Sequence, residues 1–180
     1  DQFLSTSEKA MVYYMDNRAT VLGGVAVVLI SIASFFGFKY FKKTQTLANE
    51  AFYFEIEKIV DTAKDSKPTS EVESILNKIG DGLQKERASL LLADLYFQNQ
   101  EYDKADALYS TVMNSSSAGQ GNYQLAQVGL AYNYESNKQY QKAIDLFKSV
   151  IDANTDFPLF EVYWSLSRCY ELNSDSSNAL

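Results

Sequence analysis

Acidic side chains are the residues of this chain best suited to acid–base chemistry. Asp94, Asp103 and Asp106 are examples, and two carboxylates held close together could act as general acid and general base. Their spacing, however, follows the outer faces of predicted helices, where solvated carboxylates are usual. The sequence has no histidine, glycine-rich phosphate loop, nucleophile elbow or metal-ligand spacing. It therefore predicts a protein that is not an enzyme and that binds no cofactor or metal.

Composition narrows the function further. The net charge of −7 argues against a nucleic-acid-binding protein, whose binding surface should be basic. The single cysteine, Cys169, excludes an intrachain disulfide and is expected to be a small buried hydrophobic residue. Only two prolines and eight glycines interrupt the chain, which favours an all-helical fold.

An internal repeat predicts the helices that carry the acidic side chains. The segment NQEYDKADALYSTV (99–112) aligns without a gap with NKQYQKAIDLFKSV (137–150), and Ala105 then matches Ala143. A third, incomplete copy would place Ala179 at the same position. Each copy is expected to be a helical hairpin. A small residue on its buried face lets the two helix axes come close together.

This pattern resembles the tetratricopeptide repeat over residues 86–180, with the third repeat incomplete. A degenerate first repeat is expected over 44–85. Its second helix would begin with a capping box formed by Ser70 and Glu73. The resemblance implies an α-solenoid, in which stacked hairpins share one continuous core.

The first helices of such repeats line a concave groove, which is the candidate partner-binding site. Phe97, Tyr132 and Trp164 would form an aromatic strip there, suited to apolar or mixed segments of another polypeptide. The lysines and asparagines with which some tetratricopeptide domains clamp a carboxylate are absent. Alternatively, these side chains cover neighbouring helices or a C-terminal cap. The predicted groove residues are Arg87, Leu90, Asp94, Phe97, Val128, Tyr132, Trp164 and Arg168.

Upstream of the repeats, residues 19–38 (ATVLGGVAVVLISIASFFGF) carry no charge. At about 1.5 Å per residue this stretch would span about 30 Å, the thickness of a bilayer's hydrocarbon core. A basic and aromatic collar after it extends the predicted transmembrane anchor to residues 19–43; the alternative is a buried core helix. Small residues of the anchor could pack on a partner's helices: Gly23, Gly24, Ser31 and Ser34.

Residues 1–18 are expected to form a short helical segment, with Ser5 and Glu8 at capping-box spacing. The distribution of positive charge around the anchor bears on its orientation. Lys9 and Arg18 precede the anchor, whereas three lysines (residues 39, 42 and 43) follow it. The positive-inside rule therefore leans, by one residue, toward a cytoplasmic repeat domain.

The lead-in STSEKA…DNR, the anchor with its collar and the acidic repeat array together resemble the ancillary SecYEG translocon subunit (YfgM-like) family. That resemblance implies a single-pass protein of the bacterial inner membrane with periplasmic repeats. Its implied partners are the Sec translocon, periplasmic chaperones and translocating clients. Two alternatives remain: a structural scaffold subunit of a large cell-envelope assembly, such as a secretion or motility machine, and a regulatory subunit of a membrane enzyme.

Overall fold

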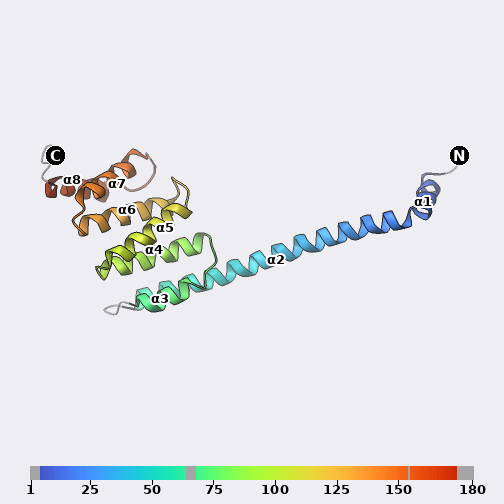
Figure 1. Cartoon of the computed structure of the whole chain (residues 1–180), viewed down its shortest axis with the longest axis horizontal. Coiled ribbons are helices and arrows are strands. Elements are labelled where there is room, and N and C mark those ends of the chain that lie inside the picture. Colours follow the sequence, from blue (N-terminus) through green and yellow to red (C-terminus); the bar gives the residue numbers. More distant parts are fainter. Residues whose placement is uncertain (1–4, 64–67, 154, 174–180) are drawn as a thin grey trace. The chain divides into compact units, whose positions relative to one another are not determined.

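The computed structural model describes residues 5–63, 68–153 and 155–173, and the regular structure of these residues is entirely helical (Figure 1). The all-α prediction is therefore confirmed. The helices are α1 (Thr6–Asp16), α2 (Arg18–Thr62), α3 (Thr69–Leu76), α4 (Leu83–Gln98), α5 (Tyr102–Ser115), α6 (Gly121–Ser136), α7 (Tyr140–Asp152) and α8 (Phe160–Leu172).

The chain divides into two compact units, Asp1–Thr46 and Leu47–Leu180. In the first unit, α1 begins with the predicted capping box. The Ser5 hydroxyl accepts a hydrogen bond from the Glu8 amide at 3.4 Å, and the Glu8 carboxylate accepts one from the Ser5 amide at 2.7 Å. The hydrogen bond from the Ser5 backbone is the main reason that the pKa of Glu8 is lowered.

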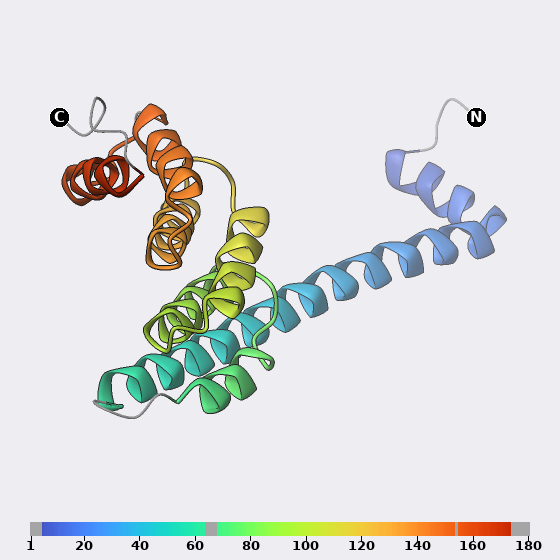
Figure 2. The same cartoon turned by 60° about the vertical axis from the view of Figure 1, so that its left-hand side comes forward.

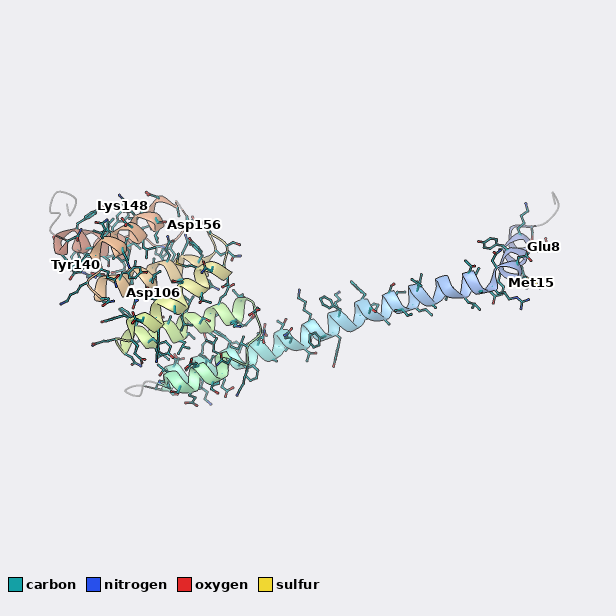
Figure 3. All side chains as sticks on the ribbon, in the orientation of Figure 1. Glu8, Met15, Asp106, Tyr140, Lys148 and Asp156 are labelled. Atoms are coloured by element: carbon teal, nitrogen blue, oxygen red, sulfur yellow. The ribbon has the colours of Figure 1, made fainter. Side chains whose placement is uncertain are left out.

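Helix α2 begins in the first unit at Arg18 and continues directly into the uncharged segment, residues 19–38. A stretch of this helix is long and apolar enough to cross a membrane, with a mean hydropathy of 2.4, and none of it is buried. Its side chains extend outward on both sides of the helix in Figure 3. The alternative of a core helix buried within this chain therefore finds no support among the described residues.

The four small residues of this segment, at positions 23, 24, 31 and 34, are exposed. A Cβ added to Gly23 or Gly24 would meet no atom within 4 Å, and Ser34 is exposed. The Ser31 hydroxyl donates a hydrogen bond to the Val27 carbonyl at 2.8 Å. That these residues pack on a partner's helices stays a prediction.

In the second unit, α4 packs on α5, α5 on α6, α6 on α7 and α7 on α8 (Figure 2). The turns within the two complete hairpins have the same structure. Gln100 and Lys138 adopt positive φ angles of 62° and 59°. In each turn the following amide donates to a carbonyl in the last turn of the helix, from Glu101 to Tyr96 at 2.9 Å and from Gln139 to Tyr134 at 2.8 Å. These bonds form a Schellman motif, which ends the first helix and reverses the chain.

Alanines occupy the crossings between paired helices, as the repeat pattern predicts. Ala93 and Ala105, from α4 and α5, have no solvent exposure, and neither do Ala131 and Ala143, from α6 and α7. Large side chains such as Phe147 fill the space on either side of the crossings. The predicted third crossing alanine, Ala179, lies outside the described residues.

Corresponding tyrosines of α4 and α6 make a recurring contact within each hairpin, and one of them also reaches the preceding hairpin. The Tyr96 hydroxyl donates to the Glu73 carboxylate at 3.2 Å, and Lys104 Nζ lies 4.9 Å from the centre of the tyrosine ring. In the next repeat, Lys142 Nζ lies at the same distance from the ring of Tyr134. Each lysine therefore makes a cation–π contact with the tyrosine two residues before the end of the first helix of its own hairpin.

The C-terminal part of α2 shares a hydrophobic core with α3. That the two form a degenerate first repeat over residues 44–85 stays a prediction. Tyr53 and Ile56 of α2 are buried in the same core cluster as Val72 and Ile75 of α3. Asn49 fixes the end of this hairpin, because its side chain accepts from the Gly80 amide at 3.0 Å and donates to the Gly80 carbonyl at 3.3 Å.

The predicted capping box of α3 is wrong. Helix α3 begins at Thr69, with Pro68 as its N-cap and no capping hydrogen bond from a side chain. Ser70 therefore lies inside the first turn, where its side chain cannot cap the helix. The Glu73 carboxylate instead accepts the hydrogen bond from Tyr96 of the next repeat.

Replacing Ala143 with leucine should test the crossing between α6 and α7. Three extra heavy atoms at a site without solvent exposure would force the helices apart, so we expect Ala143→Leu to lower the free energy of unfolding by about 1–3 kcal/mol. The matched control is Ala107→Leu, at an exposed position of α5. Chemical denaturation measures both, and equal stability of the two variants would contradict the helix register.

The positive φ angle of Lys138 gives a second prediction. Only glycine adopts this conformation without steric cost, so Lys138→Gly should raise the free energy of unfolding by about 0.5–1 kcal/mol. Lys138→Ala removes the same side chain without relieving the backbone, and it should give no such gain. If both variants have the same midpoint in urea, the turn is not built as described.

Candidate protein-binding groove

A pocket of about 430 Å³ lies along α4 and α6, with contributions from one tyrosine each of α2 and α5. Its walls are mostly aliphatic or aromatic, and its polar groups are few. The residues that line it are Tyr53, Arg87, Leu90, Leu91, Asp94, Tyr109, Asn122, Leu125, Val128, Gly129 and Tyr132.

The structure brings together five of the residues that the sequence assigned to the groove. Arg87, Leu90 and Asp94 come from α4, one above another at helical spacing. Val128 and Tyr132 come from the facing part of α6. That a partner contacts these residues stays a prediction. The structure shows that all five line the same pocket.

The other three predicted groove residues do not line this pocket. Phe97 is half-buried, with its ring centre 6.2 Å from that of Tyr102. Trp164 lies on α8 and is 64% exposed. Arg168 Nε and Nη2 donate to the carboxylate of Glu135 on α6, at 2.5 Å and 2.9 Å. The structure therefore does not join Phe97, Tyr132 and Trp164 in one pocket.

The pocket wall depends on a close approach of α5 to α6. A Cβ added to Gly129 would lie 2.5 Å from Cε1 of Tyr109, far inside van der Waals contact. Tyr109 is 2% exposed, so its ring has little room to move. Repeat spacing did not reveal this pair. A glycine in the middle of a helix destabilises it by about 1 kcal/mol relative to alanine. The presence of Gly129 inside α6 was therefore the one feature of the sequence that indicated a close contact there.

Tyr109 also places the groove carboxylate. Its hydroxyl donates a hydrogen bond to Asp94 Oδ1 at 2.5 Å. Desolvation raises the pKa of Asp94, and the hydrogen bond from Tyr109 opposes this rise. Desolvation, followed by the nearby charge of Asp94, raises the pKa of Tyr109. The phenol therefore stays protonated at neutral pH and acts as a hydrogen-bond donor.

Arg87, at one end of the pocket, is held by α2. Its guanidinium carbon lies 4.2 Å from the ring centre of Tyr53, a cation–π geometry, and Nη2 lies 3.9 Å from Glu57 Oε1. The Tyr53 hydroxyl donates to the same Glu57 oxygen at 2.5 Å. The charge of Arg87 is thus partly offset within the protein.

Tyr132 forms another part of the pocket wall and rests on the core. Its ring meets that of Phe147, which has no solvent exposure, edge to face, with the centres 5.4 Å apart. This support fixes the ring without using its hydroxyl. Tyr132 therefore offers a partner both an apolar face and a polar group.

The arrangement favours binding over covalent chemistry. Cys169 has no solvent exposure, and desolvation raises its pKa to about 12, so it is a protonated thiol at neutral pH. Among the described residues, no group of three or more His, Cys, Asp or Glu side chains is placed to hold a metal ion. Asp103 and Asp106 lie on α5, outside the residues that line the groove.

Comparison with known proteins gives a match to one family model. A family model described as a tetratricopeptide repeat-like domain matches residues 12–157, well over half of the chain. No curated protein matches the chain. Domains of this kind are generally non-catalytic modules for protein–protein interaction. From the repeats, the crossings and this match, the chain belongs to the tetratricopeptide repeat-like domain family.

Proposed function

We propose that this protein is a membrane-anchored module for protein–protein interaction, and that the pocket on α4 and α6 is its partner-binding surface. The observation that carries the proposal is the pocket itself. It combines aliphatic walls from Leu90, Leu125 and Val128 with the polar groups of Asp94 and Tyr132. Apolar contact area with a few placed polar groups is what recognition of a polypeptide segment requires.

The anchor in this proposal is the uncharged part of α2. Its length, its mean hydropathy of 2.4 and the exposure of its apolar side chains fit a helix surrounded by lipid. We place the protein in the bacterial inner membrane as a single-pass protein. A stretch this long would be costly to leave exposed to water.

The finer proposal is an ancillary role at the Sec translocon, with assistance to translocation or hand-over to chaperones. Its support is the resemblance of the lead-in, the anchor, the collar and the acidic repeats to the ancillary translocon subunit family. That resemblance favours periplasmic repeats, whereas the lysine excess after the anchor favours the cytoplasm. A structural subunit of a large envelope assembly is the alternative, and it would use other faces of the repeats.

A charge placed in the groove should remove partner binding without unfolding the repeats. Leu125 lines the pocket yet is 52% exposed, so Leu125→Glu should leave helicity and stability nearly unchanged. We expect it to reduce at least fivefold the recovery of periplasmic chaperones or translocating chains in mild-detergent purification from native membranes. The physical reason is that a partner would cover the new carboxylate with apolar groups. Burying an unpaired polar group in this way costs about 1–3 kcal/mol, and a charge costs more.

The matched control for that experiment is Leu83→Glu. Leu83 begins α4, is 56% exposed and does not line the groove. Recovery should equal that of the unmodified protein. If Leu125→Glu and Leu83→Glu recover the same partners in the same yield, the groove is not the binding surface.

The anchor gives a separate prediction. Val27→Arg combined with Ile30→Arg places two charges near the middle of the uncharged segment, each costing about 2.5–3.5 kcal/mol in a bilayer. The double variant should leave the membrane fraction on alkaline carbonate extraction, while the unmodified chain remains in it. If the double variant and the unmodified chain both remain in the membrane fraction, this segment does not anchor the protein. Protease added to intact spheroplasts would then report on which side the repeats lie.

A further inference from the structure

The charged side chains near the groove differ in how they are neutralised. The guanidinium of Arg87 is held by Tyr53 and Glu57, and Arg168 is held by the carboxylate of Glu135. Asp94 takes part in none of the ion pairs found among the described residues. Its hydrogen-bond donor is a neutral phenol, that of Tyr109. The groove therefore contains a carboxylate whose charge the described chain does not offset.

The surroundings of Asp94 strengthen its need for a cation. Leu90, Leu91 and Val128 line the same pocket, so the Asp94 side chain is exposed to solvent beside apolar walls, and partial desolvation raises the pKa of its carboxyl group. A charge in such a place interacts more strongly with an opposite charge than it would in bulk water. A charge-assisted hydrogen bond is also stronger than one between neutral groups.

We infer that the groove recognises a polypeptide segment of another protein in which a lysine or arginine is flanked by aliphatic side chains. The basic group pairs with Asp94, and the aliphatic neighbours occupy the walls formed by Leu90, Leu125 and Val128. The apolar stem of a lysine or arginine fits the same walls while its charged end reaches the carboxylate. This inference rests on the proposed function and adds the chemistry of the partner.

Other occupants fit the groove less well. An acidic segment would bring a second negative charge to Asp94, and the nearest groove cation, Arg87, is already engaged by Glu57. A neutral apolar segment would remove the remaining water from the carboxylate without replacing it, which is costly. The net charge of −7 also favours the approach of basic segments over acidic ones.

Three synthetic peptides test the inference. They share the sequence Ser-Leu-Leu-X-Leu-Leu-Ser with blocked ends, and X is lysine, norleucine or glutamate. Binding is measured by fluorescence anisotropy to the full chain in nanodiscs of zwitterionic lipid, with empty nanodiscs as background. We expect the lysine peptide to bind at least about tenfold more tightly than the norleucine peptide, a difference of about 1.4 kcal/mol. The glutamate peptide should bind most weakly.

Two protein variants locate the effect. Asp94→Asn retains an acceptor for the Tyr109 hydroxyl but removes the charge, so the preference for lysine over norleucine should fall below about twofold. Asp145→Asn, at an exposed position of α7 outside the groove, should keep the full preference. Circular dichroism tests whether both variants fold. If Asp94→Asn does not fold, the comparison of the three peptides on the unmodified chain decides whether the groove prefers lysine.

The outcomes separate this inference from the proposed function. If the lysine and norleucine peptides bind equally and Leu125→Glu weakens both, the groove binds polypeptides but not through Asp94, and the inference is overturned. It is also overturned if Asp94→Asn keeps the preference for lysine. If the unmodified chain binds none of the peptides, the proposed function falls together with the inference.

Discussion

Close approach of neighbouring helices through small side chains is the constraint on which the repeat unit depends. Ala105 and Ala143 have no solvent exposure. The ring of Tyr109 leaves no room for a methyl group at position 129, which is glycine. These contacts hold the axes close enough for larger side chains to close the core around them. Helices α4 and α6 both pack on α5 and also contact each other, and together they line the groove.

Tyr109 takes part both in the packing of the helices and in the proposed binding site. Tyr109 packs on Gly129 with its ring and orients Asp94 with its hydroxyl. A buried residue thereby fixes the position of a charge that a partner can reach. Arg87 is positioned similarly, by the face of Tyr53 and the carboxylate of Glu57. Side chains held in this way lose little conformational entropy on binding, which favours affinity.

Much of the fold follows from sequence periodicity, while the contacts between repeats do not. The aligned alanines predicted the crossings, and helical spacing brought Leu90 and Asp94 to the groove. The predicted cap of α3 is wrong because Pro68, not Ser70, precedes the helix. The contact of Tyr109 with Gly129 depends on how one hairpin stacks on the next, which repeat spacing alone does not specify. The ring contact of Phe97 with Tyr102 lies within one hairpin, at its turn, and the helical spacing of Phe97 was equally compatible with the groove.

Methyl NMR on the full chain in nanodiscs is the most direct measurement of where partners bind. Titration with a basic, leucine-rich segment is predicted to shift the methyl resonances of Leu90, Leu125 and Val128 together, with a common dissociation constant. Leu83 and Leu172, which are exposed on α4 and α8 but do not line the pocket, should not respond. Shifts confined to those two residues, or spread evenly over the exposed leucines, would contradict the account.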